Sequence, residues 1–282
     1  SQLTEPFAQS KNDFEIFKCL AQRMGVEKKF TEGRTAEEWI RWIYDGTRKN
    51  ARDIKQEMPS YDQFLKKGWF KFDPPKYPTV MLEEFRSDPT KNGLSTPSGK
   101  IELFSATVAA FDYDDCPGFP FWNEPCEWLG NLDSKYRLHL ISNQPKDKLH
   151  SQLDHGSVSQ ANKINGREPI YMHPDDAKIR LLKNDDLVKV YNSRGSCFAS
   201  VRRDYSVREG VVQMSTGAWY DPVEPKEPFS SCKNGNPNVL TPDKGTSRLG
   251  QGPIAHSCLV EVVKFEGHVD PVTAYEPPKI IR

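Results

Sequence analysis

The sequence predicts a mixed α/β protein, in which an N-terminal helical segment and an irregular connector precede a small closed β-barrel. Three observations support this prediction. Apolar residues recur at helical spacing in residues 1–70, prolines and aromatics are concentrated in 71–135, and short alternating segments separated by turns fill most of 136–282. Many short strands favour a barrel over an open sheet, because a closed barrel has no exposed edges.

Three helices are expected in residues 1–70. The motifs SKND, TAEE and SYDQ each place a Ser or Thr three residues before an acidic or amide side chain, a pattern that satisfies free N–H groups at a helix start. Trp39 and Trp42, on the second helix, are most simply interpreted as core residues. Each helix also has a glycine where a left-handed C-terminal cap fits: Gly25, Gly46 and Gly68.

Residues 71–135 are too rich in proline for long helices or central strands. They also contain aromatic residues such as Phe119, Trp122 and Trp128, which favour packing against a surface over a disordered linker. An ordered but irregular connector is therefore expected.

The last segment has the alternation of apolar and polar residues that is typical of strands. The stretches RLHLIS, VVQMS and CLVEVVKF each predict one strand, and LVKVYNSRGSCFASVRR predicts a hairpin that turns at residues 192–195. The stretch HPDDAKIRLL predicts a short helix, because Asp175 and Asp176 are favourable in a first helical turn.

Composition excludes several classes of protein. Lys plus Arg equals Asp plus Glu at 39 each, which argues against bulk electrostatic binding to nucleic acid or to an anionic membrane. No apolar run approaches the roughly 20 residues of a membrane span. The six cysteines form no C-x-x-C pair, so scattered reduced thiols are favoured over a zinc or iron–sulfur site. The chain does not begin with Met, so we expect a processed chain or a piece of a longer protein.

Four polar loops lie between the expected strands: 142–152, 165–169, 217–222 and 235–252. They are rich in Asn, Gln, Ser, Thr and Gly and poor in carboxylates. Amide side chains both donate and accept hydrogen bonds, and glycine lets a backbone approach a ligand closely. These properties favour a large neutral or anionic ligand with heterocyclic edges, such as a nucleotide.

The histidines of the first loop leave other interpretations open. His150 and His155 are five residues apart, which does not place them on one face for a metal. A nucleophile pair of His150 with Ser151 is weaker, because adjacent side chains diverge and there is no G-x-S-x-G motif. A structural hydrogen bond from His150 is a third interpretation. No phosphate loop of the G-x-x-x-x-G-K-[ST] type and no G-x-G-x-x-G motif is present, so scattered loops would hold any nucleotide.

The order of the motifs TPSGKIELFS, HSQ, NGREP, GAWY and GNPNVLTPDKGTS…QG resembles the C-terminal portion of the dimethyl sulfoxide reductase family, closest to its trimethylamine-N-oxide and biotin sulfoxide reductases. The resemblance runs over nearly the whole chain. It implies a six-stranded, double-psi-type β-barrel that binds molybdopterin dinucleotide, in an enzyme that carries molybdenum on a bis-molybdopterin guanine dinucleotide cofactor. The alternative function is a non-catalytic double-psi barrel module that binds protein or a small molecule.

The resemblance also implies which residues contact the cofactor. Trp219 either faces the active-site funnel or is buried packing. Lys148 stands where related sequences often have Arg, so it loses a bidentate grip and is not carried over as a contact. The family's molybdenum-ligating serine lies upstream, so no catalytic residue and no metal ligand is assigned to this chain. The implied cofactor-binding residues are Ser142, Gln144, Leu149, His150, Ser151, Gln152, Asn236, Asn238 and Gln251.

The partners implied by the resemblance are upstream domains of the same polypeptide and an electron donor such as a cytochrome. Neither nucleic acid nor a membrane span is expected. By itself the chain is expected to be inactive and free of cofactor. The family subgroup suggests a periplasmic location, and its biotin sulfoxide reductase-like members suggest the cytoplasm as the alternative.

Overall fold

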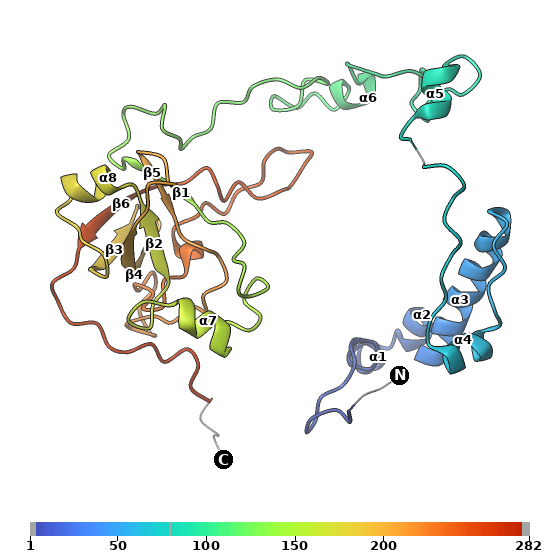
Figure 1. Ribbon diagram of the computed structural model, residues 1–282, viewed down its shortest axis with the longest axis horizontal. Coiled ribbons are helices and arrows are strands. Elements are labelled where there is room, and N and C mark those ends of the chain that lie inside the picture. Colours follow the sequence, from blue (N-terminus) through green and yellow to red (C-terminus); the bar gives the residue numbers. More distant parts are fainter. Residues whose placement is uncertain (1–3, 79, 278–282) are drawn as a thin grey trace. The chain divides into compact units, whose positions relative to one another are not determined.

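The computed structural model describes residues 4–78 and 80–277 (Figure 1). The chain divides into two compact units, Ser1–Lys100 and Ile101–Arg282. The three-part division at residues 70 and 135 stays a prediction. In the described part of the chain, no helix is long and apolar enough to span a bilayer.

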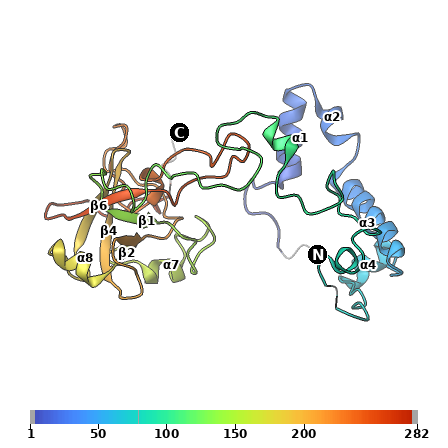
Figure 2. The ribbon, with the colours of Figure 1, turned by 90° about the horizontal axis from the view of Figure 1, so that it is seen from above.

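The first unit is helical, as predicted. Helix α1 packs beside α2, and α3 packs beside α4 (Figure 2). The buried side chains Tyr44, Ala51, Met58 and Tyr61 form a small core between α3 and α4. The helices of this unit are α1 (Asp13–Arg23), α2 (Glu27–Thr31), α3 (Ala36–Asp53), α4 (Tyr61–Lys67) and α5 (Glu83–Ser87).

Two of the three predicted helix starts are confirmed. Thr35 forms a reciprocal capping box with Glu38, and Ser60 forms one with Gln63. The first helix differs, because Asn12 rather than Ser10 is its cap and accepts the N–H of Glu15. An amide oxygen one residue before the helix caps as well as a serine hydroxyl does.

The predicted end of the second helix is wrong. Helix α3 continues through Gly46 to Asp53, because one glycine costs only about 1 kcal/mol inside a helix. Gly25 and Gly68 follow their helices with positive φ, as predicted. Trp42 is 57% exposed, so the predicted tryptophan core is wrong for that residue. Its ring instead packs edge-on against Trp39 under the guanidinium of Arg34.

The connector has little regular structure, as its prolines predict. Within the second unit it includes one short helix, α6 (Ala106–Ala109), and then no strand before residue 138. Several of its aromatic rings contact one another: Trp122 packs against Trp128 and Phe119 against Phe121. Phe119 and Trp122 remain 50% and 67% exposed, so these contacts cover their rings only in part.

The second unit is built on a closed six-stranded barrel, which confirms the predicted fold class. Around the barrel the order is β1-β5-β2-β4-β3-β6, with parallel pairs β1–β5 and β2–β4 and antiparallel neighbours elsewhere. The strands are β1 (Leu138–Ile141), β2 (Pro169–Met172), β3 (Leu187–Tyr191), β4 (Ser196–Arg203), β5 (Val211–Gln213) and β6 (Leu259–Lys264). Its short helices are α7 (Ser157–Asn162), α8 (Pro174–Ile179) and the 3-10 turn η1 (Pro237–Val239).

The barrel interior is apolar. Alternate residues of the strands point inward, so β1 contributes Leu138 and Leu140 and β3 contributes Val188 and Val190. Strand β4 is buried along six consecutive residues, because loops cover its outer face. The predicted β3–β4 hairpin is confirmed, and β2 is a strand that the sequence pattern did not predict.

Candidate functional site: the polar mouth of the barrel

The strand pairing gathers the polar loops at one end of the barrel. Strands β1 and β5 are parallel and end together at Ile141 and Gln213. Their neighbours β2 and β6 are antiparallel to them and therefore begin at the same end. We call this end the polar mouth, formed by the connections 142–168, 192–195 and 214–258. All four loops singled out in the sequence belong to these connections, while the β2–β3 and β4–β5 connections lie at the opposite end.

The loop after β1 is joined to the loop after β5. The backbone N–H of Thr216 donates to the carbonyl of Asn143 at 3.0 Å, and the side-chain amide of Gln213 donates to the Asn143 side chain at 2.7 Å. Parallel neighbouring strands make this possible, because their C-terminal ends are adjacent. The two segments therefore form one continuous surface.

A glycine brings these two loops into close contact. A Cβ atom on Gly217 would lie 1.8 Å from the carbonyl oxygen of His150, so only glycine fits here. Gly217 also has φ +100°, which strongly favours glycine. His150 and Leu153 have φ of 52° and 65°, values that non-glycine residues adopt only where surrounding contacts hold them.

Trp219 packs over the same loop. Its indole N–H donates to the carbonyl of Ser151 at 2.7 Å, and its ring lies 5.5 Å from that of His155 and 5.6 Å from that of Tyr275. The side chain is half-buried. Trp219 therefore contributes to the packing of the mouth, which was one of the two roles expected for it.

Beneath the loop lies a buried network of two lysines and two carboxylates. Lys148 and Lys163 each contact both Asp154 and Glu168: Lys148 is 2.8 Å from Asp154, and Lys163 is 2.6 Å from Glu168. All four side chains are at most 6% exposed. Removing one member would leave an uncompensated buried charge, so the network stabilises the mouth as a unit.

Asp154 is the centre of this network. Its carboxylate accepts hydrogen bonds from the N–H of Trp219 at 3.0 Å, from the hydroxyl of Tyr275 at 2.7 Å and from Ser159 at 3.3 Å. Burial alone would raise its pKa. The hydrogen bonds from Lys148, Tyr275 and Trp219, together with the charge of Lys163, more than offset burial and hold the pKa of Asp154 well below its usual range.

Lys163 of this network keeps its positive charge. Burial lowers the pKa of Lys163, but the nearby carboxylates of Glu168 and Asp154 outweigh burial and raise it above its usual value. Lys148, which stands where relatives often have Arg, points into the same network. Its ammonium group is engaged by Asp154 and Glu168.

The predicted contact residues of the first loop lie on the surface of the mouth. Leu149, His150, Ser151 and Gln152 are exposed, as is Gln144, and Ser142 is half-buried. Among the described residues, no hydrogen bond or ion pair involves the side chain of His150 or of Gln152. The interpretation of His150 as a structural hydrogen-bonding residue therefore has no support in the structure.

The remaining predicted residues lie in the β5–β6 connection. The side chain of Asn236 accepts the N–H of Asn238 at 2.9 Å and so caps η1, which leaves less of it for a ligand. Gln251 donates to the carbonyls of Ser247 and Arg248 at 2.9 and 3.0 Å. Gln251 also lines a pocket of about 430 Å³ together with the connector residues Asp115 and Asn123.

The sequence prediction missed the buried network. Lys148, Asp154, Lys163 and Glu168 lie within one connection but show no recognisable spacing, and Asn234 is about 80 residues from Asp154 in the sequence. Composition gave no signal for it, because the mouth connections also contain Asp147, Asp221, Glu224, Glu227 and Asp243.

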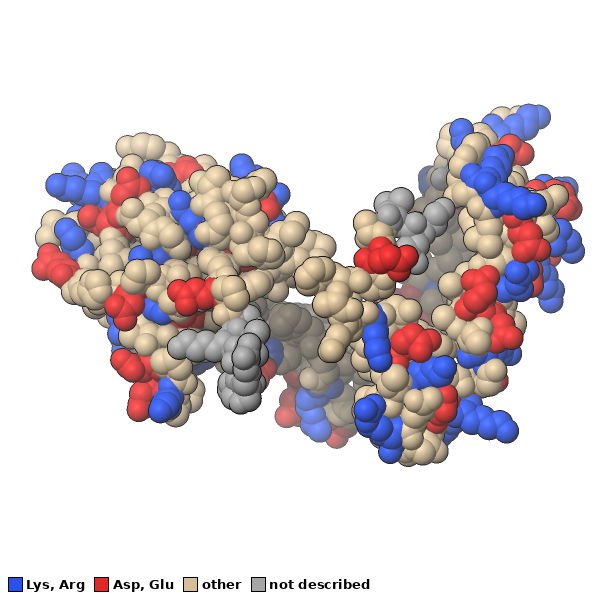
Figure 3. Space-filling model, turned by 90° about the horizontal axis from the view of Figure 1, so that it is seen from below, with Lys and Arg blue, Asp and Glu red and all other residues tan. Residues whose placement is uncertain are grey.

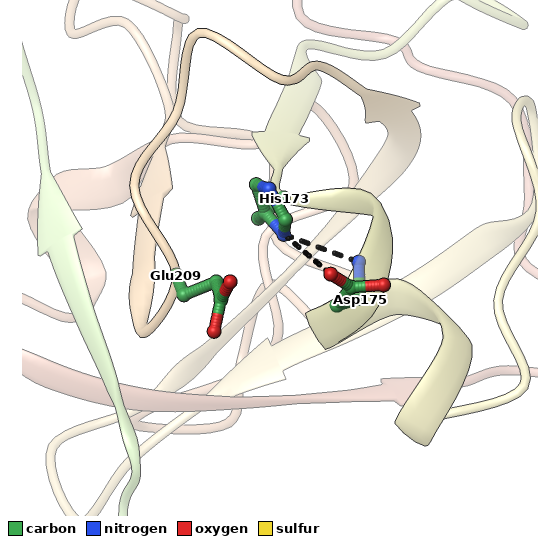
Figure 4. A group of neighbouring side chains, drawn as sticks. All are labelled: His173, Asp175 and Glu209. Carbon is green, nitrogen blue, oxygen red and sulfur yellow. Dashed lines mark hydrogen bonds and ion pairs between the residues drawn. The ribbon is translucent and has the colours of Figure 1, made fainter.

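A second group of chemically active side chains lies at the opposite end of the barrel. The ligand atoms of His173, Asp175 and Glu209 lie within 4.8 Å of one another (Figure 4). Nδ1 of His173, however, accepts the N–H of Asp175 at 3.2 Å and caps α8, and Tyr205 packs edge-on against the ring. Helix capping accounts for this arrangement, so we assign no metal to it.

The surface charge is mixed. On the face shown in Figure 3, basic and acidic side chains are interspersed on both units, and neither sign forms a continuous patch. This distribution agrees with the equal numbers of acidic and basic residues.

The side chains exposed at the mouth fit a pterin dinucleotide chemically. Apart from Leu149, the predicted contact residues carry amides, hydroxyls and one imidazole, which can pair with the donor and acceptor edges of a pterin or a purine. The buried network beneath them is neutral as a whole, with two positive and two negative side chains, so it adds no net charge that would repel a diphosphate.

Comparison with known proteins gives the same result. Residues 138–259 match the molydopterin dinucleotide binding domain family. The chain is 41% identical to the trimethylamine-N-oxide reductase of Haemophilus influenzae over 99% of its length, and 42% identical to the biotin sulfoxide reductase of Cereibacter sphaeroides over 98%. It spans 34% and 37% of the length of these relatives.

A solved structure shares the fold. Acetylene hydratase from Pelobacter acetylenicus superposes on 94% of this chain with a TM-score of 0.68 at 21% identity, and the match covers 34% of that chain. The predicted resemblance is thus confirmed by sequence, and the architecture by structure. The chain belongs to the dimethyl sulfoxide and trimethylamine-N-oxide reductase family of molybdenum enzymes, of which it matches the C-terminal third, and it contains the family's molybdopterin dinucleotide-binding domain.

Proposed function

We propose that the polar mouth holds molybdopterin guanine dinucleotide, and that this chain is the C-terminal part of an enzyme that reduces N-oxides or S-oxides. The observation that carries the proposal is the loop 149–152. Its polar side chains are exposed, two of them have no partner among the described residues, and the backbone beneath is fixed by Gly217 and Trp219. A preorganised loop with free polar groups is typical of a ligand site.

The residues proposed to contact the cofactor are those implied by the resemblance. Leu149 would provide an apolar surface for a ring, and the others would provide hydrogen bonds. The full set is Ser142, Gln144, Leu149, His150, Ser151, Gln152, Asn236, Asn238 and Gln251. The capping role of Asn236 makes its contact the weakest of the set.

The bound cofactor, in its bis form with molybdenum, would supply the oxygen-atom transfer chemistry of the complete enzyme. This chain would hold the dinucleotide, orient it through the mouth loops and exclude water with Trp219 and Leu149. Two electrons would come from a partner such as a cytochrome, and the upstream domains would supply the rest of the cofactor site. A periplasmic location is proposed, with the cytoplasm as the alternative.

The test compares His150→Ala and Gln152→Ala in the complete polypeptide, with Arg208→Ala at the opposite end of the barrel as the control. Each lost hydrogen bond costs roughly 0.5–1.5 kcal/mol, which is up to about tenfold in affinity. We expect less molybdenum and pterin per chain after dialysis, and an unchanged melting temperature of the cofactor-free protein.

Two outcomes would contradict the proposal. Variants that melt several degrees early but keep full molybdenum would make the loop a structural element. A gene whose reading frame begins close to the first residue of this chain, with no pterin in the purified protein, would favour the non-catalytic binding module.

A further inference from the structure

The segment after β6 returns to the polar mouth. Strand β6 begins at the mouth and ends at Lys264, at the opposite end of the barrel. The chain then crosses back, and residues 269–275 contact both long connections of the mouth (Figure 1). We call residues 269–275 the C-terminal strap.

The strap is fixed at three points, all polar. The buried guanidinium of Arg167 donates to the carbonyl of Asp270 at 2.9 Å. Asp221, also buried, accepts the N–H and the hydroxyl of Thr273 at 2.6 and 3.0 Å. The hydroxyl of Tyr275 donates to Asp154 at 2.7 Å.

The strap adds little to the hydrophobic core. None of residues 269–275 is fully buried, and none belongs to the apolar cluster inside the barrel. Its ordered contacts are instead directed at charged groups of the mouth loops. Such an arrangement suits the positioning of those loops better than the stabilisation of the barrel.

Tyr275 reaches the centre of the buried network. Its hydroxyl donates to Asp154 and accepts the side-chain amide of Asn234 at 2.9 Å, and its ring packs against Trp219 at 5.6 Å. Burial, followed by the hydrogen bond to Asp154, raises the pKa of Tyr275, so the phenol stays protonated and can donate at neutral pH. Asp154 in turn receives the N–H of Trp219, whose indole holds the carbonyl of Ser151.

We infer that Tyr275 is a positioning residue for the cofactor: through Asp154 and Trp219 it holds loop 149–152 in its binding conformation. The inference rests on the proposed function of that loop. The strain at His150 and Leu153 gives the loop a reason to relax once its supporting contacts are removed. Tyr275 itself need not touch the dinucleotide.

The test uses Tyr275→Phe, which keeps the ring against Trp219 and removes only the hydroxyl. The matched control is Tyr205→Phe. The ring of Tyr205 packs on His173 at the opposite end of the barrel. In the 282-residue chain we expect amide hydrogen exchange in residues 149–156 to become roughly three- to tenfold faster in Tyr275→Phe, with exchange in β3 and β4 unchanged.

In the complete enzyme the same substitution should accelerate loss of pterin during dialysis by a similar factor, while Tyr205→Phe should not. Unchanged exchange in residues 149–156, or faster exchange with unchanged pterin retention, would overturn the inference alone. Absence of pterin from the unsubstituted enzyme would overturn the proposed function. A general drop in protection across the barrel would show that the hydroxyl serves stability and would also overturn the inference.

Discussion

The two ends of the barrel are built from the same six strands but differ in how their connections are held. At the opposite end the β4–β5 connection is short, 204–210, and the β2–β3 connection is closed by a capped helix and exposed ion pairs such as Asp185–Arg202. At the mouth the connections run over 142–168 and 214–258 and rest on buried charges. The difference teaches that long loops are ordered here by an internal polar network rather than by their own secondary structure.

Substitution of Asp154 is expected to have the largest effect on stability. Asp154→Ala should lower the free energy of unfolding by about 3–5 kcal/mol, because it leaves two buried lysines with one carboxylate. Asp185→Ala, which removes an exposed pair at the other end, should cost about 0–1 kcal/mol. Urea denaturation of both variants measures the contrast, and similar costs would show that the mouth network adds nothing beyond a surface pair.

A smaller loss of stability is expected when one of two glycines, Gly217 at the mouth or Gly210 at the opposite end, is replaced by alanine. Gly217 and Gly210 both have positive φ, but a Cβ at Gly217 would meet the His150 carbonyl at 1.8 Å, whereas at Gly210 it would meet only the flexible Leu129 side chain at 3.4 Å. Gly217→Ala should cost about 3 kcal/mol or more and Gly210→Ala about 1 kcal/mol.

Thermal and denaturant unfolding of the two alanine variants gives the comparison directly. Crystal structures should show the loop at His150 displaced only in Gly217→Ala. If both variants lose the same stability, the close approach of the two loops does not constrain the mouth.

The smallest effect is a pH dependence that originates at the mouth. The pKa of Asp154 is depressed in the folded chain, so the unfolded chain binds its proton first, near pH 4. The stability that this group contributes is present above that pH and is lost as the pH falls toward the folded pKa, by at most about 1.4 kcal/mol per pH unit. Asp154→Asn should flatten the acid side of the stability curve between pH 3 and 5, and an unchanged slope would place the acid sensitivity elsewhere.

Most of the barrel could be predicted from the sequence, because apolar and polar residues alternate along a strand that has one face to the core and one to solvent. Strand β3 shows this, since its buried and partly exposed residues alternate before the turn at residues 192–195. Strand β2 could not be predicted, because three of its four residues are buried and it begins at a proline. Its partners β4 and β5 are also distant in sequence, so no local pairing signal marks it.

The site was predictable in a different way. The composition of the mouth loops indicated a large polar ligand, and motif order indicated the family. The contacts that hold the loops join Lys148 to Glu168 and Asp154 to Tyr275, across 20 and 121 residues. No periodicity connects such pairs, because they are brought together only when the barrel closes.

The pairing of β1 has a consequence for the order in which the chain can fold during synthesis. Its partners Val211 and Val260 emerge from the ribosome about 70 and 120 residues after it. The β3–β4 hairpin is local and can form as soon as it is made, whereas β1 must remain an unpaired strand until β5 and β6 are complete. Translation therefore leaves an interval in which a hydrophobic strand is exposed, and in which the surface that β1 helps to complete is still open to an entering molecule.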